Sequence, residues 1–257
     1  MRIFIPTMGR PNTQKTLTAL PPSLRAITTL VVPMGEINTY SIGRKEMVVG
    51  TKVKGIAATR QWIMDNSPTD HLVMLDDDLA FFKKDKDRKI IGATPGDIEQ
   101  AFKWLEAQLK GGFAHAGITI RSMNWQHPGP FMENTRMMHV LAYNRKMVEQ
   151  AGCSFTKGVT SSFSMDDFHM TLQLLRKGYS NRLQVDYCTN PSASNSEGGA
   201  SLWRTLETQN ASAEALGKLH KGFVKVTAKK AVWKGMEGER KDVIVQWRKA
   251  FNSSQET

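Results

Sequence analysis

Short apolar runs alternate with amphipathic stretches along the first three quarters of the chain, and this pattern predicts alternating strands and helices. The apolar runs that read as strands are residues 3–6, 30–33, 71–75, 113–120, 138–143 and 183–187. Helical segments at 13–19 and 56–64 separate the first three of these strands. Such an order is typical of an α/β domain, so we expect a mostly parallel central sheet.

The segment from Thr94 to Gly112 carries the clearest helix signals in the sequence. Thr94 can cap the amino end, Pro95 suits the first turn, and two glycines end the helix. The apolar positions that share one face are Ile98, Ala101, Phe102, Leu105 and Leu109. This face is predicted to pack into the core.

One predicted strand, residues 71–75, ends in three carboxylates, Asp76, Asp77 and Asp78. Binding sites in open α/β sheets lie just beyond the carboxyl ends of the strands. In an extended chain Asp76 and Asp78 point to one side and Asp77 to the other. Two convergent carboxylates bind a hard divalent cation, which completes its coordination with water and substrate phosphates. The sequence therefore predicts a metal site for nucleotide chemistry, and the alternative is a solvated turn that caps the next helix.

The same acidic spacing recurs at Asp85 and Asp87, where the context differs. These two residues lie in the charged run 83–89, which has no apolar strand directly before it. A run of mixed charges is typical of a solvated loop. We therefore assign the metal site to Asp76 and Asp78 and not to this second pair.

Composition and length fit one enzyme-sized unit. With 257 residues, 40% hydrophobic and 23% charged, the chain can bury a full core. The apolar runs are shorter than the roughly 18 residues of a membrane span, and residues 1–6 resemble a strand and not a secretory signal. We expect a cytoplasmic protein without a membrane partner. Cys153 and Cys188 form neither a metal-ligand spacing nor a disulfide framework, and both are predicted to be ordinary thiols.

Positive charge is concentrated near the carboxyl end. The chain has 35 Lys and Arg against 24 Asp and Glu, a net charge of +11, and the segment 218–249 alone has ten basic and three acidic residues, a net of +7. Phe223, Trp233 and Trp247 lie among these cations, as is typical of a protein that binds a polyanion. The alternative is an ordinary basic surface whose aromatic residues belong to the core, since residues 243–247 also read as a half-buried strand. We predict an α/β domain over residues 1–200 and a basic α+β extension over residues 201–257.

The sequence resembles the GT-A glycosyltransferases from Met1 to about Pro191. Residues 3–7 with Arg10 are similar to the family's nucleotide-recognition strand, and the helix that carries Arg60 is similar to the one that approaches the diphosphate. Residues 76–78 take the place of the family's Asp-x-Asp metal motif. Residues 164–168 open a helix as the family's acidic acceptor-side motif does, with Asp166-Asp167 in place of the usual Glu-Asp.

This resemblance implies a GT-A nucleotide-binding fold, a nucleoside-diphosphate sugar such as a UDP-sugar as donor, and Mn²⁺ or Mg²⁺ as the metal. The residues that it assigns to the donor are Thr7, Arg10, Arg60 and Asp77. Those assigned to the metal are Asp76, Asp78 and, as a late histidine, His220. It makes Asp167 the catalytic base and Asp166 its neighbour. Two alternatives remain open, because acids at a helix start also serve as caps and His220 beside Lys218 and Lys221 also reads as a surface residue.

Residues 5–11 and 242–249 further resemble the TET-associated glycosyltransferases of bacteriophages. That family is associated with sugar addition to 5-hydroxymethylpyrimidines in DNA. The resemblance implies DNA with hydroxymethylated bases, such as 5-hydroxymethylcytosine, as the acceptor, and the cytoplasm of a bacterial host as the location. A base in a duplex is stacked and must be flipped to react, with Trp125 or Phe131 as candidate stacking residues.

The sequence leaves other functions open. A GT-A glycosyltransferase could act on a glycan or a small molecule, and a nucleic-acid-binding protein without catalysis would also need the basic segment. A nucleotidyltransferase could use the same acidic strand end. We expect a metal-dependent glycosyltransferase, in which the metal and Arg60 stabilise the departing diphosphate and Asp167 deprotonates the acceptor hydroxyl.

Overall fold

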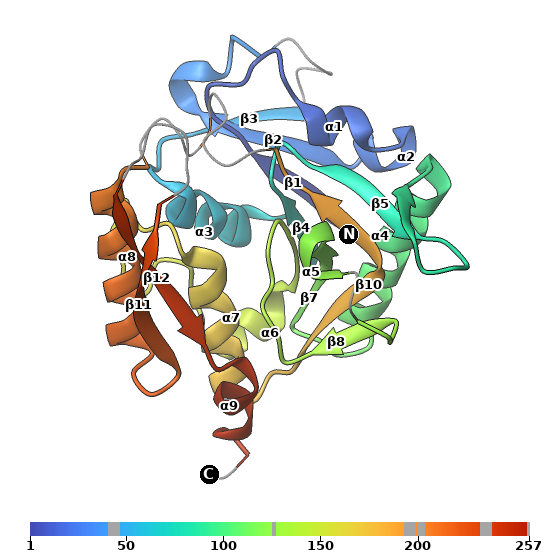
Figure 1. Ribbon diagram of the computed structural model, residues 1–257. Coiled ribbons are helices and arrows are strands. Elements are labelled where there is room, and N and C mark those ends of the chain that lie inside the picture. Colours follow the sequence, from blue (N-terminus) through green and yellow to red (C-terminus); the bar gives the residue numbers. More distant parts are fainter. Residues whose placement is uncertain (41–46, 125–126, 193–198, 200–203, 232–237, 256–257) are drawn as a thin grey trace.

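A large mixed sheet with helices on both faces forms the body of the protein in the computed structural model (Figure 1). The structure describes residues 1–40, 47–124, 127–192, 199, 204–231 and 238–255. Trp125 and Trp233 lie outside these described residues. The predicted α/β class is confirmed.

The strands and helices follow one another in the predicted order with several additions. Up to the acidic motif they are β1 (Arg2–Pro6), α1 (Lys15–Ala19), α2 (Pro22–Arg25), β2 (Thr28–Pro33), the 3-10 helix η1 (Met34–Glu36), β3 (Val48–Thr51), α3 (Ile56–Asn66) and β4 (His71–Leu75). The middle of the chain forms β5 (Ala80–Lys84), β6 (Ile90–Gly92), α4 (Pro95–Lys110), β7 (His115–Ile120), α5 (Arg121–Asn124), β8 (Phe131–Glu133), β9 (Val140–Asn144) and α6 (Arg145–Gln150). The remainder is α7 (Asp166–Arg176), β10 (Asn181–Asn190), α8 (Leu206–Leu219), β11 (Val224–Lys230), β12 (Glu239–Val245) and α9 (Trp247–Asn252).

The sheet order brings the carboxyl ends of four strands to one edge. The order is β3-β2-β1-β4-β9-β7-β10-β5-β6, with β8 paired to β10. The strands β3, β2, β1 and β4 run parallel, whereas β9 is antiparallel to both β4 and β7. Parallel strands end at a common edge, so the residues after β1 and β4 lie side by side there.

Side chains of the buried strands alternate between the two faces of the sheet, and both faces are buried, which explains the continuous apolar sequence of these strands. In β4, Val73 and Leu75 belong to one core cluster with α1, α2 and α4, while Leu72 and Met74 belong to a second cluster with α3, α6 and α7. Helices thus cover both faces of the sheet, and no position of the strand interior is left for a polar residue. The predicted helix after Thr94 is confirmed, because Thr94 and Asp97 form a reciprocal capping box at its start.

The carboxyl-terminal segment packs on the outer side of α7. Figure 1 shows α8 beside the hairpin β11–β12, with α7 between this group and the sheet. A third apolar cluster joins Leu172 and Leu175 of α7 to Leu216 of α8 and Ala250 of α9. The strand predicted at 243–247 ends earlier, because Trp247 begins α9.

Strand pairing divides the cations of the hairpin between its two faces. Lys229 pairs with Arg240, and the next pair is Lys230 with Glu239. Neighbouring residues of a strand point to opposite faces, so Lys229 and Arg240 share one face and Lys230 lies on the other. Val224 and Val226 are on the face of Lys230, and they pack into the cluster with α8.

Candidate active-site cleft

A cleft of about 1220 Å³ opens at the edge where β1, β2, β3 and β4 end. The residues after β1 and β4 line one side of it, and residues from α7, the start of α8 and the hairpin β11–β12 line the other. We call the first the strand-end wall and the second the carboxyl-terminal wall. The strand-end wall holds Thr7, Arg10, Arg60, Asp76, Asp77 and Asp78, and the carboxyl-terminal wall holds Arg136, Asp166, Asp167, Arg204, Lys229, Arg240 and Asp242.

Arg60 and Asp76 form the centre of a buried polar network. Arg60 is 6% exposed on α3, and its two terminal nitrogens donate to Asp76 at 2.7 Å and to Asp166 at 2.6 Å. The second carboxylate oxygen of Asp76 lies 2.6 Å from Nδ1 of His139. Each charged group here has an opposite partner, which offsets the cost of removing it from water.

The position of His139 follows from the register between β4 and β9. Leu75 pairs with Val140 in this antiparallel ladder, so the residue after Leu75 faces the residue before Val140. The backbone N–H of Asp76 accordingly donates to the carbonyl of His139 at 3.0 Å, and His139 has a φ of 58°. Sequence reasoning missed this residue, because only the strand pairing connects it with Asp76.

The network fixes the charges of its members. Burial alone would lower the pKa of the Arg60 guanidinium, but the charges of Asp166, Asp76 and Asp167 raise it above its ordinary value. Burial would also raise the pKa of Asp76, yet the hydrogen bond with His139 and the charge of Arg60 lower it to about 2. Arg60 is therefore a permanent cation and Asp76 a permanent carboxylate at neutral pH.

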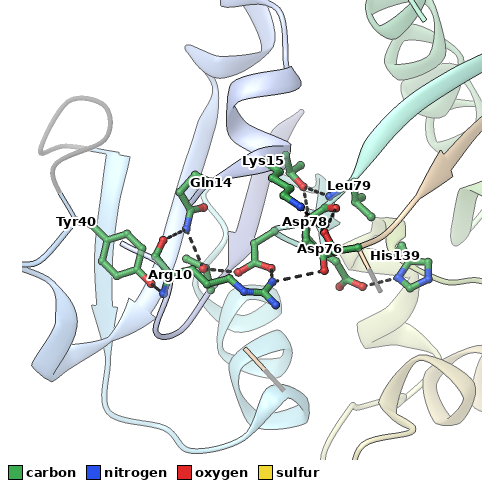
Figure 2. Close-up of polar contacts among 12 residues, drawn as sticks. Arg10, Gln14, Lys15, Tyr40, Asp76, Asp78, Leu79 and His139 are labelled. Atoms are coloured by element: carbon green, nitrogen blue, oxygen red, sulfur yellow. Dashed lines mark hydrogen bonds and ion pairs between the residues drawn. The ribbon is translucent and has the colours of Figure 1, made fainter. Parts of the chain in front are cut away.

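Asp77 is held by the strand-end residues that the sequence assigned to the donor. Thr7 donates to Asp77 at 2.5 Å, and Arg10 pairs with the other oxygen of the same carboxylate. Figure 2 shows Arg10 between Tyr40 and the acidic loop, with His139 approaching Asp76 from the far side. The expectation that Asp77 points away from Asp76 and Asp78 is wrong, because β4 ends at Leu75 and the turn that follows brings all three carboxylates to the cleft.

Asp78 is the carboxylate of this loop with the weakest pairing. Its contact among the described residues is an ion pair with Arg10 at 3.6 Å. Burial, together with the charges of Asp76 and Asp77, raises the pKa of Asp78. A cation at this point would relieve that repulsion.

The donor set fits a divalent metal that takes its remaining ligands from a substrate. No group of three or more His, Cys, Asp or Glu side chains within the described residues could hold a metal ion. Both oxygens of Asp76 already have partners, but a carboxylate offers about four lone-pair sites and can accept a further one. Ions such as Mg²⁺ are held by one or two carboxylates plus water and phosphate, and Asp76 and Asp78 can supply these carboxylate ligands.

Asp167 and Asp166 are neighbours at the start of α7 with different surroundings. Asp166 is 2% exposed and is bound to Arg60. Asp167 accepts the backbone N–H of Phe168 with one oxygen at 2.9 Å, and its other oxygen lies 3.9 Å from Arg136. Asp167 lies in the first turn of α7 but does not cap it, because the N-cap residue is Met165 and the helix has no side-chain capping hydrogen bond.

Cations dominate the rest of the carboxyl-terminal wall. The Arg136 guanidinium lies 3.9 Å above the ring of Phe168, and burial lowers its pKa. On the hairpin, Asp242 pairs with Arg240 at 3.2 Å and with Lys229 at 3.5 Å. Burial also lowers the pKa of Arg204, which the charges of Asp167 and Asp76 oppose. Sequence reasoning found the basic segment but not these positions, because their convergence depends on how α8 and the hairpin pack.

A family model described as TET-Associated Glycosyltransferase matches residues 1–193 of the chain. The chain belongs to this family. No curated protein matches the sequence of this TET-associated glycosyltransferase. Its membership agrees with the resemblance drawn from residues 5–11, and the matched region ends before residues 242–249, which also carried that resemblance.

Solved structures give the fold of this TET-associated glycosyltransferase. Glucosyl-3-phosphoglycerate synthase from Mycobacterium tuberculosis, crystallised with Mg²⁺ and uridine diphosphate, matches with a TM-score of 0.52 at 10% identity, over 95% of this chain and 86% of that one. TarS from S. aureus, residues 1–349 with UDP-GlcNAc, matches with a TM-score of 0.49 at 12% identity, over 84% of this chain. The chain spans 66% of that TarS chain. The first match confirms the expected GT-A fold.

His220 does not join the metal-binding group, and its assignment as a metal ligand is not retained. It ends α8 and is 1% exposed, with Nε2 2.9 Å from Nδ1 of His169 and Nδ1 3.2 Å from Arg176. Both ring nitrogens therefore have partners in the packing between α7 and α8. It is buried and is also not the surface residue of the alternative interpretation.

Other expectations from the sequence have structural outcomes as well. Phe131 lies in β8 beneath Arg182 and does not line the cleft, so it is not the stacking residue. The expectation that no strand precedes Asp85 is wrong, because β5 ends at Lys84, but Asp85 accepts two backbone N–H groups within its own loop as expected of a turn. Cys153 and Cys188 are unpaired and buried. Within the described part of the chain, every helix is too short or too polar to cross a bilayer.

Proposed function

We propose that this TET-associated glycosyltransferase transfers a sugar from a nucleoside-diphosphate sugar, such as a UDP-sugar, to the hydroxymethyl group of a modified base in DNA, with Mg²⁺ or Mn²⁺. One observation carries the proposal. A single cleft holds the carboxylates Asp76 and Asp78 and the cation Arg60 on one wall, and Asp167 among cations on the other. Sugar transfer needs both walls, because the cations of the first wall must bind the leaving diphosphate and Asp167 of the second wall must contact the acceptor hydroxyl.

On the strand-end wall, Arg60 and Arg10 supply fixed positive charge where the diphosphate departs. Arg60 cannot move freely, because Asp76 and Asp166 hold it from two sides. A preorganised cation stabilises developing charge without reorganisation during the reaction. Thr7 and Asp77 anchor Arg10 at the end of β1, where the nucleotide would lie.

Asp78, with Asp76, would hold the metal. When bound, a divalent ion neutralises part of the charge that forms on the departing diphosphate. Two solved structures of similar fold support this assignment in kind, since glucosyl-3-phosphoglycerate synthase binds uridine diphosphate with Mg²⁺ in one and with Mn²⁺ in the other. In this chain the support is the crowding of Asp76, Asp77 and Asp78 on one wall of the cleft, directly after β4.

On the carboxyl-terminal wall, Asp167 accepts the proton of the attacking hydroxyl. One of its oxygens is used by the helix start, and the other is oriented by Arg136. General base catalysis of this kind contributes about 10²–10⁴-fold. Asp166 acts through Arg60 and is a positioning residue in this scheme.

The experiment that tests the proposal supplies a labelled sugar nucleotide and Mn²⁺ with a choice of acceptors. These are duplexes that contain cytosine, 5-methylcytosine or 5-hydroxymethylcytosine, and a glycan mixture in a parallel reaction. We expect label in the hydroxymethylated duplex alone, with release of a nucleoside diphosphate. Label in the glycan and none in the hydroxymethylated duplex would show that the acceptor is a glycan. Release of pyrophosphate would identify a nucleotidyltransferase.

A further inference from the structure

Among the described residues, the carboxyl-terminal wall has more cations than carboxylates. The cleft-lining cations of this side within the described chain are Arg136, Arg204, Lys229 and Arg240. Asp166 is already committed to Arg60, so Asp167 and Asp242 remain as partners. Asp242 is shared by Lys229 and Arg240, and Asp167 is 3.9 Å from Arg136.

Arg136 makes a long ion pair with Asp167, at 3.9 Å. Its Nε is buried without a hydrogen-bond partner, and its guanidinium stacks on Phe168. A guanidinium over an aromatic ring can still donate hydrogen bonds to a planar or tetrahedral anion. Phe168 is the residue directly after Asp167, so any anion bound by Arg136 lies next to the catalytic carboxylate.

The hairpin extends this cationic surface away from the catalytic residues. Lys225, Thr227 and Lys229 of β11 share a face with Arg240, Asp242 and Ile244 of β12, because these residues pair across the ladder. The end of this face at Lys229 and Arg240 reaches the cleft, and the other end, at Lys225 and Ile244, is exposed. A linear polyanion can follow such a face, whereas a small neutral acceptor cannot use its length.

We infer that Arg136, Lys229 and Arg240, with Arg204 beside them, form a phosphate clamp that holds the DNA backbone on both sides of the reacting nucleotide. The inference rests on the proposed function and names the part of the acceptor that the cleft recognises. Binding the flanking phosphates fixes a flipped nucleotide so that its hydroxymethyl group reaches Asp167. Phosphate contacts position the substrate and leave the choice of base to other groups.

The chemical test replaces the two phosphates that flank 5-hydroxymethylcytosine with uncharged methylphosphonates in an oligonucleotide. For the wild-type protein we expect kcat/KM for transfer to fall at least about tenfold, since a charged contact is lost. Methylphosphonates three or more nucleotides away should change kcat/KM less than twofold. Equal rates with the flanking phosphates and the flanking methylphosphonates would overturn the clamp.

The protein variants identify the residues that sense the charge. Lys229→Gln should remove most of the difference between phosphate and methylphosphonate substrates, as a double-mutant cycle measures. Lys229 is suitable because its side chain is 64% exposed and its loss leaves packing unchanged, while Arg240→Gln, at 11% exposure, is a second and more buried variant. Lys230→Gln is the matched control, because Lys230 is adjacent in sequence and lies on the opposite face. A Lys229→Gln protein that keeps the full methylphosphonate effect would exclude Lys229 from the clamp.

Binding of the same oligonucleotides, measured by fluorescence anisotropy without donor, separates the two proposals. Transfer to hydroxymethylated DNA without any effect of the flanking methylphosphonates leaves the proposed function standing and overturns the clamp. Phosphate-dependent binding without transfer to any hydroxymethylated oligonucleotide supports the clamp and overturns the proposed acceptor chemistry.

Discussion

Two arginines on opposite walls of the cleft have opposite surroundings. Arg60 is 6% exposed, and its terminal nitrogens contact two carboxylates at 2.7 and 2.6 Å. Arg136 lies 3.9 Å from its nearest carboxylate among the described residues and stacks on Phe168. The strand-end wall holds its buried arginine between carboxylates, which suits it to the chemistry of a leaving group. The carboxyl-terminal wall retains attraction for an external anion, which suits it to the acceptor.

The largest effect is expected at the metal site of the strand-end wall. Asp78→Asn removes a carboxylate whose contact is with Arg10 and should lower transfer by about 10³-fold or more, as the loss of a main electrostatic contact at a leaving group does. Treatment of the wild-type protein with EDTA should have a comparable effect. Added Mn²⁺ should restore the activity of the wild-type protein but not that of the Asp78→Asn variant. Labelled transfer measures both, and full activity of the wild type in EDTA would refute the metal assignment.

Removal of the acceptor-side carboxylate is expected to have the next largest effect. Asp167→Asn should lower transfer at least about 10²-fold, because the acceptor hydroxyl loses its proton acceptor. Donor affinity, measured by calorimetry with the sugar nucleotide, should stay within about twofold. If donor affinity were lost together with the rate, Asp167 would bind nucleotide or metal, and the two walls would not divide the reaction as proposed.

The neighbour of Asp167 is expected to affect stability more than chemistry. Asp166→Ala leaves one end of the buried Arg60 without its carboxylate, and it should lower the free energy of unfolding by about 3 kcal/mol, the low end for a broken buried pair, since Asp76 remains. Denaturant unfolding measures this change. Asp65→Ala on the exposed side of α3 is the control and should cost less than about 0.5 kcal/mol. Equal losses in the two variants would show that the Arg60 network contributes nothing to stability.

A smaller effect is expected from the histidines between α7 and α8. The Lys157 carbonyl can only accept, so His169 donates to it, His220 donates to His169, and Arg176 donates to His220. Burial lowers the pKa of His169 to about 4 and that of His220 to about 3, below the value near 6.5 in an unfolded chain. The unfolded chain then binds more protons from about pH 6.5 down to about pH 4 for His169 and about pH 3 for His220, so stability should be complete above pH 6.5 and fall as the pH falls through this window.

Unfolding by urea at several pH values measures this dependence. A His169→Gln, His220→Gln double variant should lose the part of the slope that lies between about pH 6.5 and 3. An unchanged slope in the double variant would mean that other groups carry the acid sensitivity.

The strand-end wall could be predicted from the sequence because its signals are local. An apolar run that ends in Asp76, Asp77 and Asp78 specifies a buried strand and an acidic turn within eight residues. His139 could not be found in this way, since it reaches Asp76 through the register of β4 and β9, 63 positions apart in the chain. The side of the strand to which Asp77 points was also predicted wrongly, because alternation holds only while the strand continues.

The carboxyl-terminal wall was predictable in charge and not in geometry. The count of cations over residues 218–249 identified a basic segment, but its division into two faces depends on the pairing of β11 with β12. His220 lies in this segment and was assigned to the metal on resemblance alone, whereas the packing of α8 on α7 turns it toward His169. Contacts between distant helices of this kind leave no mark in a single sequence.

The salt dependence of sugar transfer to DNA, compared with that of sugar-nucleotide hydrolysis, tests the central claim most directly. The rate of transfer to hydroxymethylated DNA should fall steeply with salt, because phosphate contacts release counterions, while hydrolysis of the sugar nucleotide without acceptor should change little. Lys229→Gln should reduce the slope of log kcat/KM for DNA against log salt concentration by about one and leave donor hydrolysis as it is. An unchanged DNA slope in Lys229→Gln, or a donor hydrolysis rate that falls as steeply as transfer, would contradict the division of the cleft into a donor wall and an acceptor wall.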